Sequence, residues 1–258
     1  MFSEDSVALI DADSIYFRVA CVTKSRKEIR KAINYMINEI KRNCLTDNVL
    51  YAVKGSGNFR HDLYPKYKAN RKELDVDLRK ALNYGHKYMC DYHGAVTADG
   101  MEADDLVSIW AREAMDVGKD YTIVGIDKDL LQIPGIHYNF VKKTHKTVDA
   151  NEGHLNLMLQ CLIGDTADNI PGIRGVGPKK ASIILHGVNP DRRWDRVRAA
   201  WRMHKAGDPL LSWRLLTMLT SWEELDEINS KIAGETPKCE QDVLQGEKQD
   251  ERISKLPE

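Results

Sequence analysis

Hydrophobic residues follow two alternating patterns along the chain, short apolar runs and helical spacings. Runs at residues 7–11, 48–53 and 121–126 are typical of buried strands. Between them, apolar residues recur every three or four positions, most clearly over 27–44, which indicates amphipathic helices. Strands separated by helices predict right-handed crossovers, so we expect an α/β fold with a mostly parallel central sheet flanked by helices.

The second half of the chain is predicted to be mainly helical. Helical patterns at about 152–163 and 178–185 flank a glycine-rich segment, and a further pattern covers about 191–205. From about residue 234 the sequence turns polar and loses its aliphatic residues, as in a frayed tail. The predicted parts are an α/β core over 1–150, a helical region over 151–233 and a polar tail over 234–258.

Acidic residues follow the predicted strands at the points where the strands end. Asp11 follows the first strand, and Asp127 and Asp129 follow the third. Because ligand sites of open α/β sheets lie at the carboxyl ends of the strands, we expect these acids to share one crevice. Further acids occur beside glycines or at the start of an apolar helical pattern: Glu102, Asp104, Asp105, Asp165 and Asp168.

Eight carboxylates in one crevice would repel one another and would be costly to desolvate without cations among them. Mg²⁺ and Mn²⁺ are hard cations that take oxygen ligands, so the pattern predicts a metal-dependent phosphoryl-transfer site. Each segment alone also has a simpler interpretation. Acids at 102–105 can stabilise a helix dipole, and the pair at 127 and 129 can belong to a turn that ends a strand.

Composition and charge agree with this prediction. The 258 residues are 42% hydrophobic and 30% charged, as in an ordinary globular protein. The formal net charge is −1, but subtracting the eight acids leaves +7, which predicts an acidic cleft within a basic surface.

The cysteines and the apolar segments bear on location. Five dispersed cysteines without a CxxC pair indicate neither a zinc site nor a disulfide framework, and they fit a reducing cytosol. The first residues lack the basic and apolar regions of a secretion signal, and no stretch reaches about 18 apolar residues. We therefore expect a cytoplasmic protein without membrane contact.

A basic segment with interleaved aromatic residues, 59–72, has the composition of a surface that contacts single strands. Cations bind phosphates and aromatic rings stack on unpaired bases. A solvated basic loop is the alternative when the segment is taken alone. Its candidate DNA-binding residues are Arg60, Tyr67 and Lys72.

The segment 170–180 resembles the hairpin of a helix-hairpin-helix. Its glycines would let backbone N–H groups approach a phosphate, and the next helix would offer its N-terminus. Pro178 suits the first helical position, where its missing N–H would be unpaired. A structural glycine turn is the alternative, and the arginines over 191–205 either contact a duplex or only solvate their helix. The candidate DNA-binding residues of the hairpin are Gly172, Gly175, Gly177, Lys179 and Lys180.

The order of the motifs resembles that of the 5′ nuclease (flap endonuclease) superfamily. The matching segments are YKANRK at 67–72, GMEADDLVS at 100–108, GIDKDLLQIPG at 125–135 and GDTADNIPGIRGVGPKKA at 164–181. The resemblance covers about residues 5–190 and is strongest to bacteriophage 5′–3′ exonucleases and the 5′ nuclease domain of bacterial DNA polymerase I.

The resemblance implies a 5′–3′ exonuclease and flap endonuclease with two Mg²⁺ or Mn²⁺ ions and a helical arch, here about 55–90. The first metal would lie among Asp11, Glu102, Asp104 and Asp105, and the second among Asp127, Asp129, Asp165 and Asp168. Lys68 and Arg71 would neutralise the scissile phosphate, and Tyr67 would stack near the 5′ end. The hairpin would hold the duplex around a monovalent cation such as K⁺.

The same resemblance implies partners and a setting. The expected substrate is duplex DNA with a 5′ end or flap, with an RNA–DNA hybrid as a further candidate. Because no polymerase segment follows in the sequence, we expect a stand-alone replication or degradation enzyme of viral origin, acting in the host cytoplasm. We also expect a monomer.

Lys54 departs from the family pattern, in which an acid often follows the second strand. Its ammonium can replace one metal charge, pair with Glu102 or contact the substrate phosphate. Lys54 therefore leaves open a weakened relative that binds branched DNA. A second alternative, independent of Lys54, is a phosphotransfer enzyme with Asp11 as nucleophile. The hairpin and YKANRK argue against the second, since neither serves a small substrate.

Overall fold

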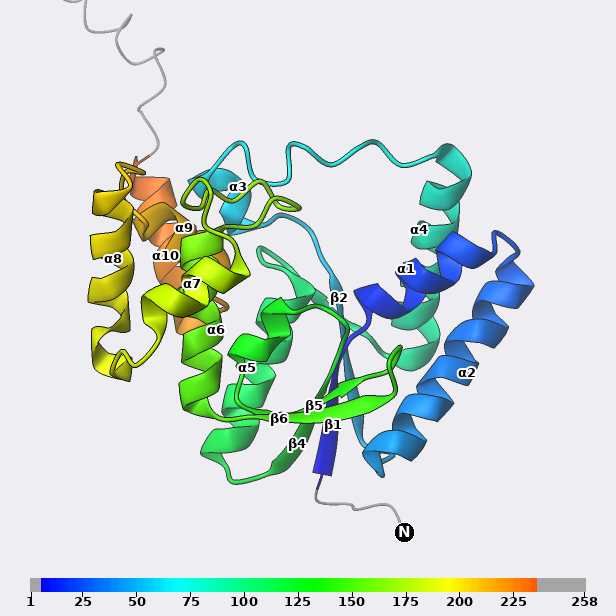
Figure 1. Cartoon of the computed structure of the whole chain (residues 1–258). Coiled ribbons are helices and arrows are strands. Elements are labelled where there is room, and N and C mark those ends of the chain that lie inside the picture. Colours follow the sequence, from blue (N-terminus) through cyan, green and yellow to red (C-terminus); the bar gives the residue numbers. More distant parts are fainter. Residues whose placement is uncertain (1–5, 236–258) are drawn as a thin grey trace, which may run out of the picture.

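A six-stranded sheet forms the centre of the computed structural model, which describes residues 6–235 (Figure 1). The strand order is β3-β2-β1-β4-β5-β6. The first five strands run parallel and β6 is antiparallel to β5, which confirms the predicted mostly parallel sheet. The strands are β1 (Ser6–Asp11), β2 (Val49–Lys54), β3 (Val96–Ala98), β4 (Asp120–Val124), β5 (Gly135–Asn139) and β6 (Thr144–Val148).

Side-chain alternation along β1 divides the α/β part into two cores. Ala8 and Ile10 pack with α1 (Asp13–Val22), α2 (Arg26–Cys44) and α4 (Val76–His93), whereas Val7 and Leu9 pack with α5 (Ala103–Asp116). Successive strand residues face opposite sides of a sheet, so an uninterrupted apolar run is buried on both. Helices therefore cover both faces of the sheet.

The second half of the chain builds a helical layer with its own core. The glycine-rich segment lies between α6 and α7, and both helices lie where the sequence predicts them. The third core also includes Tyr67, from the first half of the chain. The helices are α6 (Ala150–Ile163), α7 (Pro178–Leu185), α8 (Arg193–Met203), α9 (Leu210–Leu216) and α10 (Trp222–Glu235), with short 3-10 turns at Asp129–Gln132 and Pro190–Arg192.

The predicted arch is only partly helical. α3 (Phe59–Leu63) and α4 are joined by residues 64–75, here called the strap, which form turns and then extended chain. Pro65 disfavours helix for the residue before it, and α4 begins where the Asp75 carboxylate accepts a hydrogen bond from the Leu78 N–H. Figure 1 shows the strap crossing from α3 to α4 at the end of the molecule toward which β1 runs.

Three strands escaped the sequence pattern, and one prediction lies largely beyond the structure. β3 has only three residues, and the β5–β6 hairpin is too polar to give an apolar run. The predicted tail falls outside the described residues from 236 onward. Within 6–235, no helix combines the length and hydropathy needed to cross a bilayer.

A carboxylate cleft as candidate functional site

The sheet order brings the predicted acidic residues to one edge. β1 lies between β2 and β4, so Asp11, at the end of β1, lies beside the residues that follow β4, among them Asp127 and Asp129. β3, at the other side of β2, leads into Glu102, which caps α5. The structure therefore gathers acids from segments more than 100 residues apart in sequence, as expected from the strand ends.

Burial and mutual repulsion raise the pKa of several of these carboxyls. Burial, followed by the charges of Asp13 and Asp127, raises the pKa of Asp11 to about 7. Burial and then Asp127 raise the pKa of Asp129 to about 7 as well. The pKa of Asp104 is also raised, by burial and then by the charges of Asp105 and Glu102. These groups lack enough positive charge around them to stabilise their ionised forms.

Asp165 is the exception among these shifted carboxyls. Burial alone would raise its pKa, but the Lys128 ammonium, 2.7 Å from Asp165 Oδ2, and the N–H groups of Ala167 and Asp168 lower it below the ordinary value. Charge-assisted hydrogen bonds thus keep this carboxylate ionised.

Arg60 and Asp105 form a buried ion pair that corrects two predictions. Arg60 is 3% exposed and Asp105 is fully buried. Arg60 Nη1 and Nη2 lie 2.5 and 2.8 Å from the two Asp105 oxygens, and Arg60 Nε donates to the Leu215 carbonyl at 2.8 Å. The Asp105 carboxylate also accepts the N–H groups of Glu102 and Leu219. Arg60 is therefore a structural cation instead of a DNA contact, and Asp105 is occupied as its partner.

Tyr67 is also buried, which corrects its predicted stacking on DNA. The residue is 3% exposed and belongs to the third core. Its hydroxyl lies 3.1 Å from Glu102 Oε2 and 3.4 Å from Asp168 Oδ2. The Tyr67 side chain thus points from the strap into the protein and contacts acids of both groups in the cleft, Glu102 and Asp168.

The cations of the strap divide into two kinds. Lys68 Nζ pairs with Glu102 and lies 3.7 Å from Asp168 Oδ2, and Arg71 Nη2 lies 2.5 Å from Asp168 Oδ1. Lys72 is exposed. Lys66 is exposed as well. Two of the four strap cations therefore already lie on acids of the cleft, at the side where the strap passes.

Asp13 is a site residue that the sequence analysis missed. One of its carboxylate oxygens accepts the Tyr16 hydroxyl at 2.6 Å and the Lys54 N–H at 2.8 Å. Burial raises its pKa, and these two donors partly offset the rise. The signal was available, because Asp11-Ala12-Asp13 repeats the spacing of Asp127 and Asp129.

Lys54 has a fixed backbone and an exposed side chain at the rim of the cleft. Its N–H is held by Asp13, and its carbonyl lies 2.8 Å from His86 Nε2. Glu102 pairs with Lys68 instead, and no ion pair involves Lys54 within the described part of the chain. Of the three roles considered for Lys54, the structure therefore argues against pairing with Glu102, and the other two stay predictions.

The hairpin glycines differ in what surrounds them. A Cβ on Gly172 would lie 2.1 Å from the Ile163 carbonyl oxygen, so Gly172 is needed for packing against the end of α6. Around Gly175 and Gly177 a Cβ would meet no atom within 4 Å. These two glycines leave open space in front of the backbone, and Lys179 and Lys180 next to them are exposed.

The donor chemistry of the cleft fits hard divalent cations. Its ligands would be carboxylate oxygens, several of which are partly or fully buried with too little positive charge around them to keep their pKa low. Within 6–235, however, no three acidic, histidine or cysteine side chains form a ready-made metal site. Cation binding would therefore require carboxylates to move from their present hydrogen bonds, including those to Lys68 and Lys128.

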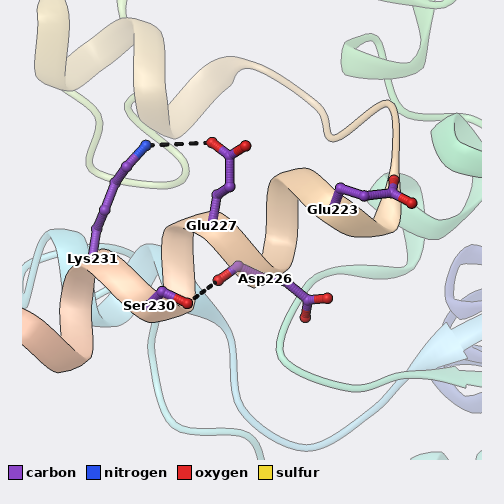
Figure 2. A pocket seen from close by; sticks show the side chains of 5 residues that line it. All are labelled: Glu223, Asp226, Glu227, Ser230 and Lys231. Atoms are coloured by element: carbon purple, nitrogen blue, oxygen red, sulfur yellow. Dashed lines mark hydrogen bonds and ion pairs between the residues drawn. The ribbon is translucent and has the colours of Figure 1, made fainter.

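A hollow of about 520 Å³ lies on the surface of α10, away from the carboxylates of the cleft. Figure 2 shows it beside one face of the helix, where Glu227 pairs with Lys231 at 3.5 Å. The other residues around it are Glu223, Asp226 and Ser230. This acidic surface would repel a nucleic acid and has no buried polar group, so the cleft at the sheet edge is the better candidate site.

Comparison with known proteins identifies the family. A family model described as the N-terminal resolvase-like domain of 5′–3′ exonucleases matches residues 6–156, more than half of the chain. This chain belongs to the 5′–3′ exonuclease family. The match covers the sheet and six of the eight predicted acids: Asp11, Glu102, Asp104, Asp105, Asp127 and Asp129. Asp165 and Asp168, in the segment that precedes the hairpin, lie beyond it.

Relatives in this family differ in length from the chain. This chain is 36% identical over 137 residues to DNA polymerase I of Rhizobium leguminosarum, and the match covers 49% of this chain and 14% of that protein. It is 32% identical over 136 residues to flap endonuclease Xni of Shewanella piezotolerans, covering 49% of this chain and 53% of that protein. The matched part thus spans about half of Xni and about one seventh of DNA polymerase I.

Solved structures share the fold. The bacteriophage T5 D15 flap endonuclease, in a complex with DNA and metal ions, matches with a TM-score of 0.66 at 18% identity, over 89% of this chain and 98% of that one. A T5 5′-exonuclease with bound zinc matches with a TM-score of 0.65 at 17% identity, with the same coverage of both chains. The arrangement of sheet and helices is therefore that of these 5′ nucleases.

Proposed function

We propose that this chain hydrolyses DNA phosphodiesters as a 5′–3′ exonuclease and 5′ flap endonuclease that depends on Mg²⁺ or Mn²⁺. The observation that carries the proposal is the crowding of partly or fully buried carboxyls with raised pKa at one sheet edge, beneath a strap that bears cations. Family membership supports it, and solved T5 relatives are described as holding DNA and metal ions.

The carboxylates would hold two divalent cations, which supply a more acidic attacking water and neutralise charge on the leaving oxygen. The first group would be Asp11, Glu102 and Asp104, and the second Asp127, Asp129, Asp165 and Asp168. Asp105 would support the first group indirectly, because its carboxylate holds the Glu102 N–H and Arg60. Asp13 would fix the geometry beside Asp11 through its hydrogen bond to the Lys54 N–H.

The strap cations would act on the substrate phosphate. Lys68 and Arg71 now pair with carboxylates of the cleft. A substrate phosphate would compete with these carboxylates for Lys68 and Arg71, and bound metal ions would compete with Lys68 and Arg71 for the carboxylates. Cations placed where negative charge develops stabilise the transition state more than the ground state.

The hairpin would hold the duplex by its backbone. Gly175 and Gly177 leave space for a phosphate to approach their N–H groups, and Lys179 and Lys180 add positive charge. The same proposal includes a K⁺ bound at the hairpin, action on an RNA–DNA hybrid and a monomeric protein.

A cleavage assay tests this function. We expect 5′-labelled duplex and flap DNA to be cut in Mg²⁺ and not in EDTA, and an RNA–DNA hybrid in parallel would define the substrate range. Binding of flap DNA without cleavage in either Mg²⁺ or Mn²⁺ would instead support the weakened relative that Lys54 suggests.

A further inference from the structure

The strap is fastened to the loop before the hairpin by hydrogen bonds that do not involve the carboxylates. The Lys68 N–H donates to the Asp168 carbonyl at 2.9 Å. The Asn169 side-chain amide donates to the Lys66 carbonyl at 2.8 Å, and the Asn70 amide donates to the Thr166 carbonyl at 2.5 Å. Donors come from both segments, so each segment holds the other. We call this set of three hydrogen bonds the latch.

Backbone strain lies on both sides of the latch. Lys68 has a φ of 55° and Asn169 a φ of 58°, in the left-handed region that residues other than glycine rarely adopt. Such conformations persist where the surrounding contacts hold them. The strain is greater at Lys68, because asparagine adopts this region more readily than lysine does. Lys68 and Asn169 lie in the two segments that the latch joins, so loss of the latch would favour release of both.

The position of the latch links three parts of the proposed enzyme. The strap carries Lys68 and Arg71, and the partner loop carries Asp165 and Asp168. Asp165 and Ile170 then exchange backbone hydrogen bonds of 3.0 and 2.7 Å where the loop continues into the hairpin. A shift of the loop would therefore move the strap cations as well.

We propose that Asn70 and Asn169 are positioning residues that hold the strap closed, with Lys68 and Arg71 directed at the cleft. Neither side chain is a carboxylate or a cation, so neither competes for a metal ion or a phosphate. The catalytic consequence rests on the proposed function, whereas the closed strap is a property of the protein alone.

Limited trypsin digestion tests the closed strap without any activity measurement. Trypsin can cut the strap at Lys66, Lys68, Arg71 and Lys72 once it opens. Asn70→Ala and Asn169→Gly should each speed cleavage there about fivefold, the effect of losing one hydrogen bond. Glycine keeps the left-handed backbone accessible, so Asn169→Gly removes the amide without adding strain.

Matched variants separate the latch from general loosening. Asn83→Ala removes an exposed amide on α4 that makes no hydrogen bond within residues 6–235, and it should leave strap cleavage unchanged. Asn169→Asp tolerates the left-handed backbone but cannot donate to the Lys66 carbonyl, so it should behave like Asn169→Gly. Wild-type rates of strap cleavage in Asn70→Ala, Asn169→Gly and Asn169→Asp would overturn the proposal.

Single-turnover kinetics test the consequence for catalysis. With the strap open, the rate at saturating enzyme should fall about fivefold while the Kd for duplex DNA stays the same. Faster strap cleavage with an unchanged rate would overturn the positioning role. A wild-type protein without nuclease activity but with the predicted trypsin pattern would refute the proposed function and leave the latch standing.

Discussion

Asp104 and Asp105 are neighbours on the first turn of α5, yet their surroundings are opposite. Asp105 is fully buried and accepts hydrogen bonds from Arg60 and from the N–H groups of Glu102 and Leu219. Asp104 is partly buried, faces Asp11 and Glu102, and has a raised pKa. The protein itself stabilises the charge of one carboxylate and leaves the other without sufficient positive charge.

This difference separates residues that hold the fold from residues that await a ligand. A buried charge with a complete set of partners resists removal, because either partner alone would be left uncompensated. A buried carboxyl among like charges gains when it is neutralised, by a proton or by a cation. Crowding of acids in the sequence therefore marks the region, and the partners of each acid define its role.

Arg60→Met should have the largest effect on stability. It would leave the Asp105 carboxylate buried without its cation, which costs about 3–5 kcal/mol. Urea denaturation of the metal-free protein would measure the loss. A loss below about 1 kcal/mol would mean that Asp105 does not depend on Arg60.

Asp104→Asn should lower activity without lowering stability. We expect cleavage of flap DNA in Mg²⁺ to fall by a factor of about 10²–10³, in the range found when one electrostatic group of an active site is removed. The free energy of unfolding without metal should stay the same or rise, because repulsion with Asp11 and Glu102 is relieved. Normal turnover in this variant would place Asp104 outside the site.

Lys68→Ala contrasts a cation on the strap with the buried Arg60. The single-turnover rate should fall about 10²-fold at saturating enzyme, with a smaller change in DNA affinity. Stability should change by about 1 kcal/mol or less, because the Lys68 pair with Glu102 is partly exposed. An unchanged rate would remove Lys68 from the mechanism.

Lys54→Asp tests a cation that has no ion-pair partner within the described residues. If Lys54 substitutes for a metal ligand, the added carboxylate should lower the Mg²⁺ concentration for half-maximal activity, by about tenfold if it contributes one more ligand. If Lys54 holds the substrate phosphate, KM should rise and the Mg²⁺ midpoint should stay. An unchanged KM and midpoint would place Lys54 outside both roles.

The sequence predicts the edge of the sheet better than it predicts the partners of each acid. Apolar runs define β1, β2 and β4, so the convergence of Asp11 and Asp127 follows from strand order. The Arg60–Asp105 pair joins residues 45 positions apart through the packing of α3 on α5, which no local pattern records. Tyr67 lies in a segment with the composition of a DNA-binding surface, but tertiary packing places its side chain in the third core.

Binding of Mn²⁺ measured by calorimetry at pH 6.5, in two buffers of different ionisation enthalpy, tests most directly whether the unpaired carboxyls receive cations. Asp11 and Asp129 have pKa values of about 7, so below that pH both carry protons in the folded, metal-free protein. The folded protein holds these protons more tightly than the unfolded chain does, so the metal-free protein becomes less stable as the pH rises from about 4 to about 7. Cations must displace the same protons when they bind. We predict that binding releases protons, and that Asp11→Asn releases fewer. Binding without proton release, or equal release by both proteins, would contradict the account.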